Sequence, residues 1–129
     1  MIAEDSTDTA ETLAVGLRSE GYRVWLAATG TRAMRCYWRA VDRGEYFRLV
    51  ILDCALPGLD GWSAAANIRR AEVFVQGLPR AYLIGYTGYG EEAEELVTDG
   101  DKGNFDEVLT KGCEWSALLA AVRRAGCGE

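Results

Sequence analysis

The feature that most constrains the fold is a run of apolar residues that ends at an acid. Residues 49–52 read Leu-Val-Ile-Leu, and the next residue is Asp53. An uninterrupted apolar run of this length predicts a strand buried on both faces, as in a parallel sheet. Turn-forming residues at 57–61 predict a loop directly afterwards. Because open α/β sheets place ligands at the carboxyl ends of their strands, Asp53 is a candidate functional residue. The alternative is a helix cap or a turn aspartate.

Strand-like and helix-like patterns alternate along the whole chain. Besides 49–52, the pattern predicts strands at the amino terminus and over 22–26, 82–86 and 108–110. It predicts helices over about 7–20, 30–43 and 91–97, one that follows Gly61 and turns Trp62, Ala65 and Ile68 inward, and one that contains Trp115, Leu118, Leu119 and Val122. In the second of these helices, a buried stripe of core residues is expected, formed by Met34, Tyr37, Trp38 and Val41.

This alternation predicts right-handed βαβ units and a parallel sheet with helices on both faces. The expected fold is α/β and flavodoxin-like: a (βα)5 three-layer sandwich whose five-stranded parallel sheet has the order 2-1-3-4-5. At 129 residues the chain is long enough for one domain. We place that domain at residues 1–125, with 126–129 as a tail or the start of a linker.

Composition excludes several function classes. The net charge is −6, from 14 basic and 20 acidic residues, which argues against a nucleic-acid surface. No apolar run is long enough to span a bilayer and no leader is present, so we expect a cytoplasmic protein without a membrane partner. Four widely spaced cysteines without a CxxC pair disfavour zinc. The absence of histidine excludes Ser-His-Asp and Cys-His catalysis, but hard-cation chemistry on carboxylates stays open.

Polar residues stand at four of the predicted strand ends. They are Glu4-Asp5, Asp53, Thr87 and Lys111. Carboxyl ends of parallel strands share one edge of a sheet, so these side chains are expected to converge. Crowded carboxylates repel one another unless a cation such as Mg²⁺ neutralises them. A cation, an ammonium, a hydroxyl and a nucleophilic carboxylate together suit phosphoryl transfer to Asp53.

In these features the whole chain resembles the receiver domain of two-component response regulators, the family of the chemotaxis regulator. The matching segments are Glu4-Asp5, residues 52–61, 86–88 and 109–112. The resemblance implies a signalling phosphoacceptor domain that catalyses only its own phosphorylation and dephosphorylation, rather than an enzyme acting on other substrates. The donor would be the phosphohistidine of a sensor histidine kinase or phosphotransfer protein.

The resemblance also implies a role for each site residue. Asp5, Asp53 and the backbone carbonyl of Ala55 would bind Mg²⁺ (or Mn²⁺), and Glu4 would act through water. Thr87 and Lys111 would hold the phosphoryl oxygens once Asp53 is phosphorylated. Movement of Thr87 would then reshape the face formed by the fourth helix, fifth strand and fifth helix, which would bind a downstream protein or a second copy of the chain.

The sequence departs from the family pattern at several positions. Gly112 replaces the proline that usually follows the lysine, which puts the usual cis peptide in doubt. Val108 stands where a switch Tyr or Phe is common, and Ala55 and Tyr89 occupy positions that tune phosphoryl hydrolysis. Only three residues precede Glu4, so the first strand looks clipped, as in a piece of a longer chain or one with a misplaced start.

Several readings stay open at this point. A stand-alone regulator and a receiver module of a hybrid histidine kinase share the same features. An aspartyl-phosphate phosphohydrolase is the alternative from another class, but it needs a second aspartate where this chain has Ala55. A flavin-binding module would be repelled by the charges of Glu4-Asp5, and a degenerate receiver would lack the principal residues that are retained here.

Overall fold

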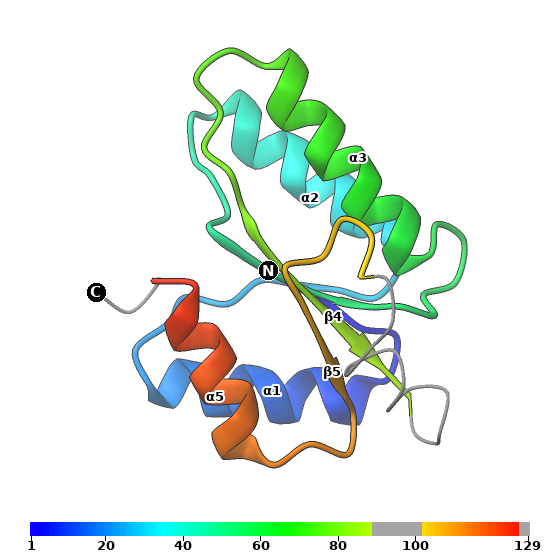
Figure 1. Ribbon diagram of the computed structural model, residues 1–129, viewed down its shortest axis with the longest axis vertical. Coiled ribbons are helices and arrows are strands. Elements are labelled where there is room, and N and C mark those ends of the chain that lie inside the picture. Colours follow the sequence, from blue (N-terminus) through cyan, green and yellow to red (C-terminus); the bar gives the residue numbers. More distant parts are fainter. Residues whose placement is uncertain (89–101, 127–129) are drawn as a thin grey trace.

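Five short parallel strands make one sheet at the centre of the fold (Figure 1). The computed structural model describes residues 1–88 and 102–126. Within them the strands are β1 (Ile2–Ala3), β2 (Leu26–Ala27), β3 (Leu49–Asp53), β4 (Tyr82–Thr87) and β5 (Glu107–Thr110). Their order in the sheet is β2-β1-β3-β4-β5, and each neighbouring pair is parallel. The predicted topology is therefore confirmed.

Helices cover both faces of this sheet, which gives the predicted three layers. Figure 1 shows α1 (Thr7–Ser19) and α5 (Trp115–Arg124) on one face and α2 (Gly30–Asp42) and α3 (Gly61–Phe74) on the other. The helix expected over 91–97, and most of the expected tail at 126–129, lie outside the described residues. None of the helices within the described ranges combines the length and the apolar character needed to cross a membrane.

The alternating side chains of β3 hold the two helical layers to the sheet. Val50 and Leu52 belong to the apolar cluster under α2 and α3, whereas Ile51 belongs to the cluster under α1 and α5. All three are at most 1% exposed. Because each such side chain stabilises the fold by about 1.5–3 kcal/mol when fully buried, β3 is strongly held in register, and this fixes the position of Asp53 at its end.

Two local predictions were wrong. The strand expected over 22–26 forms only at Leu26–Ala27, because the preceding backbone groups are used elsewhere: the Tyr22 N–H donates to Leu17 O at the end of α1, and Arg18 donates to the carbonyl of Val24.

Trp38, expected in the core, is 40% exposed. The buried face of α2 is formed instead by Gly30, Ala33, Met34 and Tyr37. Trp38 lies beside this face and contacts Tyr37 edge to face, with ring centroids 5.8 Å apart. A helix of period 3.6 turns residue 38 about 100° away from its neighbour 37, so both cannot face the sheet equally.

Candidate functional site

Three carboxylates gather at the carboxyl edge of the sheet. In the register of β1 and β3, Ala3 lies opposite Leu52, so the residues that follow, Glu4 and Asp53, lie side by side. Carboxylate oxygens of Glu4, Asp5 and Asp53 all lie within 4.8 Å of one another. Glu4 and Asp53 are each 3% exposed, whereas Asp5 is exposed. The cluster thus has a buried floor and one carboxylate that reaches solvent.

Lys111 brings a cation to this cluster from the other half of the sheet. Its Nζ lies 2.8 Å from Asp53 Oδ2 and 3.0 Å from Glu4 Oε1. The backbone holds it there, because the Lys111 N–H donates to Thr87 O at 2.7 Å and so extends the pairing of β4 with β5. Residues more than 100 positions apart in the chain therefore meet, as the parallel topology predicts.

Backbone donors occupy some of the remaining carboxylate oxygens. The Ala55 N–H donates to Asp53 Oδ1 at 2.9 Å, and the Ser6 N–H donates to Glu4 Oε1 at 3.2 Å. Glu4 Oε2 is buried and has no hydrogen-bond partner among the described residues. A buried acceptor without a partner costs about 1–3 kcal/mol, so this oxygen is suited to water or another donor held beside it.

Burial and charge shift the pKa values of Glu4, Asp53 and Lys111. Burial raises the pKa of Glu4 above its ordinary value; the hydrogen bond from Lys111 opposes this, and the neighbouring Asp53 adds to it. Burial acts on Asp53 too, but hydrogen bonds from Lys111 and from the Ala55 N–H outweigh it, so the pKa of Asp53 is lowered. For Lys111, bonds to the two carboxylates outweigh burial and raise its pKa. At neutral pH Asp53 is therefore an ionised carboxylate beside an ammonium.

Thr87 reaches the same edge at the end of β4. Asp53 lies opposite Tyr86 in the register of β3 and β4, so Thr87 is one residue further along. The neighbouring Cys54 is a free thiol, and burial raises its pKa to about 12. The thiol therefore stays protonated at neutral pH and is no nucleophile.

The loop after β3 brings the start of α3 into close contact with the backbone of Asp53. A Cβ added to Gly61 would lie 2.2 Å from the backbone oxygen of Asp53, so only glycine permits this approach. Asp60 caps α3 by accepting from the Ser63 N–H at 2.8 Å. The sequence predicts a helix after Gly61. The structure adds that Asp60 caps this helix and that its first residue, Gly61, touches the candidate phosphoacceptor.

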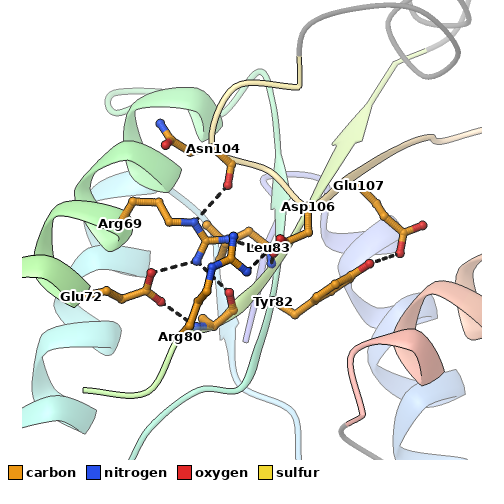
Figure 2. A network of polar contacts seen from close by, with 9 residues as sticks. Arg69, Glu72, Arg80, Tyr82, Leu83, Asn104, Asp106 and Glu107 are labelled. Atoms are coloured by element: carbon orange, nitrogen blue, oxygen red, sulfur yellow. Dashed lines mark hydrogen bonds and ion pairs between the residues drawn. The ribbon is translucent and has the colours of Figure 1, made fainter. Parts of the chain in front are cut away.

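A second polar network, which the sequence analysis missed, holds the segment that leads to β5 (Figure 2). Arg69 on α3 donates to Glu72 Oε1 at 2.9 Å, to Asp106 Oδ2 at 2.8 Å and to the carbonyl of Ala81 at 2.8 Å. Asp106 also accepts from the Leu83 N–H at 2.8 Å. The Arg69–Glu72 spacing is a recognisable helical pair, but no local signal pairs Arg69 with Asp106, 37 residues away.

The cluster of acids fits a hard divalent cation. Mg²⁺ prefers oxygen ligands and keeps several waters when one or two carboxylates bind it. Asp5 and Asp53 offer such carboxylates, and the unpartnered Glu4 Oε2 could accept from a coordinated water. Lys111 neutralises only one of the three negative charges, so the site retains the excess negative charge that a cation requires.

Comparison with known proteins agrees with this architecture. A family model described as the response regulator receiver domain matches residues 1–123. The chain is 32% identical over 123 residues to the transcriptional regulatory protein TcrA of Mycobacterium tuberculosis, which covers 95% of this chain and 44% of TcrA. It is 28% identical over 125 residues to the sensor histidine kinase AtsR of Burkholderia thailandensis, covering 96% of this chain and 19% of AtsR.

Solved structures show the same likeness. A CheX–CheY–BeF3–Mg²⁺ complex from Borrelia burgdorferi is similar with a TM-score of 0.77 and 25% identity, covering 97% of this chain and 86% of that one. The N-terminal domain of a response regulator/sensory box/GGDEF protein from Carboxydothermus hydrogenoformans has a TM-score of 0.73 and 27% identity, covering 96% and 90% of the two chains.

The sheet order and the acids at its carboxyl edge define a flavodoxin-like α/β domain with a carboxylate site. The family match over residues 1–123 identifies it further: the chain belongs to the response regulator receiver domains. It spans less than half the length of TcrA.

Among the described residues no peptide bond is cis, Lys111–Gly112 included, in keeping with the glycine at that position.

Proposed function

We propose that this chain is the phosphoacceptor of a two-component phosphorelay, and that Asp53 receives the phosphoryl group. The observation that carries the proposal is the environment of Asp53. Its carboxylate is buried at the end of β3, with the Lys111 ammonium 2.8 Å away and two further carboxylates within 4.8 Å. The donor is the phosphohistidine of a histidine kinase or phosphotransfer protein, since this chain contains no histidine of its own.

In this reaction an Asp53 oxygen attacks the phosphorus as the bond between phosphorus and the donor's imidazole nitrogen breaks. The lowered pKa keeps Asp53 ionised and nucleophilic at neutral pH. Lys111 is placed to stabilise the negative charge of the transferred phosphoryl group, because its Nζ already donates a hydrogen bond to the carboxylate that becomes the acyl phosphate. The Thr87 hydroxyl, one residue beyond the partner of Asp53 in β4, is a donor for a second phosphoryl oxygen.

A divalent cation completes the charge balance of the proposal. Asp5, Asp53 and the carbonyl of Ala55 would hold Mg²⁺ or Mn²⁺, with Glu4 binding one of its waters. When bound, it supplies positive charge that neutralises the phosphoryl oxygens during transfer. The solved complex from Borrelia burgdorferi, which contains Mg²⁺ and BeF3 with a receiver-like fold, supports this assignment.

The output of the domain is proposed to pass through Thr87 to the face that includes β5 and α5. Val108, where the family often has an aromatic switch residue, is 2% exposed, so an aromatic side chain there would have to displace core contacts. The relatives include both transcriptional regulators and a sensor histidine kinase. A phosphohydrolase is disfavoured, because the residue two after Asp53 is Ala55 and offers no acid.

Beryllofluoride with Mg²⁺, a mimic of the aspartyl phosphate, tests the proposal directly. Trp62 is the second residue of α3 and lies beside the Gly61 contact with Asp53, so its fluorescence should change on binding. The change should require Mg²⁺, disappear in Asp53→Asn and be lost in Trp62→Phe. A response that persists in Asp53→Asn would refute the assignment of Asp53.

A further inference from the structure

A groove lined by arginines lies on the α2 side of the molecule, and none of its lining residues belongs to the Asp53 site. Its volume is about 640 Å³, and α2 and the segments 23–25 and 45–47 form its walls. Five arginines line it, although the chain as a whole has a net charge of −6. Glu45 is the only acid among its lining residues within the described part of the chain. We call this feature the arginine groove.

Four of the arginines form one stripe along α2 and the residue that caps its carboxyl end. Arg32, Arg35, Arg39 and Arg43 follow one another at spacings of three, four and four residues, and all are exposed. At a rise of 1.5 Å per residue the stripe is about 16 Å long. None of them forms an ion pair with a carboxylate of the described residues. Like charges at this spacing destabilise a helix, so an anionic partner would relieve their mutual repulsion.

The opposite wall of the groove is aromatic. Trp25 and Tyr46 are 39% and 45% exposed. The ring of Trp25 contacts that of Phe47 edge to face, with ring centroids 5.5 Å apart. The guanidinium of Arg23 lies 5.1 Å from the centre of the Trp25 ring. Tryptophan, tyrosine and arginine are the residues most enriched at the energetic centres of protein interfaces. The groove therefore offers both charge and apolar contact area to a partner.

The geometry favours an extended occupant. A compact anion would reach only neighbouring arginines, whereas an extended segment of about six residues, at about 3.2–3.4 Å per residue, covers the whole stripe of about 16 Å. The groove also adjoins β2, which is an edge strand of the sheet, and edge strands accept extended segments. The net negative charge of the domain repels long nucleic acids.

We propose that the arginine groove binds an extended acidic segment of a protein partner that carries an aromatic or large aliphatic side chain. Its carboxylates would lie on the stripe of α2, and its apolar residue would contact Trp25 and Tyr46. This surface contains none of the phosphoacceptor residues, so the proposal does not depend on the proposed function.

Fluorescence anisotropy with a labelled peptide of sequence EEEFEEE, at low salt, tests the proposal. Arg35→Gln combined with Arg39→Gln should weaken binding about tenfold, equivalent to about 1.4 kcal/mol. Arg48→Gln combined with Arg123→Gln removes the same charge from exposed positions outside the groove and should weaken it less than twofold. A labelled oligothymidylate of equal charge should bind wild type more weakly than the peptide.

Three results would overturn the proposal. They are no peptide binding by the wild type, an equal loss in both double variants, and tighter binding of the oligothymidylate, which would make the groove a nucleic-acid site. Urea unfolding of both double variants verifies the fold. Phosphorylation by acetyl phosphate should be unchanged in both, because the substituted arginines do not touch the Asp53 site.

Discussion

Replacing Lys111 by methionine removes the cation from between two buried carboxylates. Lys111 Nζ bonds Asp53 Oδ2 at 2.8 Å and Glu4 Oε1 at 3.0 Å. Methionine keeps much of the side-chain volume but carries no charge and donates no hydrogen bond. We therefore expect Lys111→Met to destabilise the folded protein when divalent cations are absent.

The expected loss in the free energy of unfolding follows from how deeply the ion pairs of Lys111 are buried. Removing one partner of a fully buried ion pair costs about 3–5 kcal/mol. The Lys111 side chain is 20% exposed, so solvent screens part of this, and we expect a loss of about 2–3 kcal/mol at pH 7. Adding Asp53→Asn removes one of the two carboxylates left facing each other, so the double variant should recover about 1–2 kcal/mol.

The loss should also depend on pH. In the wild type the pKa of Asp53 is lowered from its ordinary value of 3.8, so its stabilising contribution is present above that value and is lost as the pH falls through the lowered pKa. The variant lacks this contribution. Its Glu4, whose pKa burial already raises, takes up a proton readily as the pH falls. The difference in the free energy of unfolding between the wild type and Lys111→Met should therefore become smaller toward acid pH.

Urea unfolding followed by tryptophan fluorescence, in EDTA, measures these free energies. Lys102→Met, at the other lysine of the chain, is the matched control and should change stability by less than about 0.5 kcal/mol. If Lys111→Met costs no more than this control, or if Asp53→Asn recovers nothing, the reasoning about the buried charges is wrong.

Three further changes test other parts of the domain. Ala55→Asn should alter the lifetime of the aspartyl phosphate without abolishing its formation; an unchanged decay rate, followed by intact mass, would count against that placement. Gly61→Ala should slow phosphorylation by acetyl phosphate and destabilise by about 1–3 kcal/mol, because its Cβ would lie 2.2 Å from the backbone oxygen that ends β3. Gly88→Ala, whose Cβ would meet nothing within 4 Å among the described residues, should do neither. Arg69→Ala should lower the free energy of unfolding by about 2–4 kcal/mol and Arg70→Ala, on the exposed side of the same turn, by less than 1 kcal/mol; equal losses in urea unfolding would show that the network contributes little.

The topology could be predicted because each strand carries its own signal. The apolar run at 49–52 identifies a central strand, and in a parallel sheet the residue after every strand must reach the same edge. This is why Glu4, Asp53 and Lys111 could be placed together without any knowledge of their contacts. Their roles in phosphoryl transfer stay predictions.

The features that could not be predicted depend on contacts between distant residues. Whether Trp38 or Tyr37 faces the core depends on how α2 is rotated against the sheet, which a periodic apolar pattern constrains only within one residue. The pairing of Arg69 with Asp106 joins α3 to the segment before β5, and the sequence around either residue does not indicate its partner. The extent of β2 depends on which side chains take its backbone groups.

Intact-mass spectrometry after incubation with acetyl phosphate is the most direct test of the claim that Asp53 is a cation-dependent phosphoacceptor. The wild type should gain the mass of one phosphoryl group in the presence of Mg²⁺ and none in EDTA, and Asp53→Asn should gain none in either. Phosphorylation of Asp53→Asn at the wild-type rate, or an equal gain by the wild type in EDTA, would contradict the account.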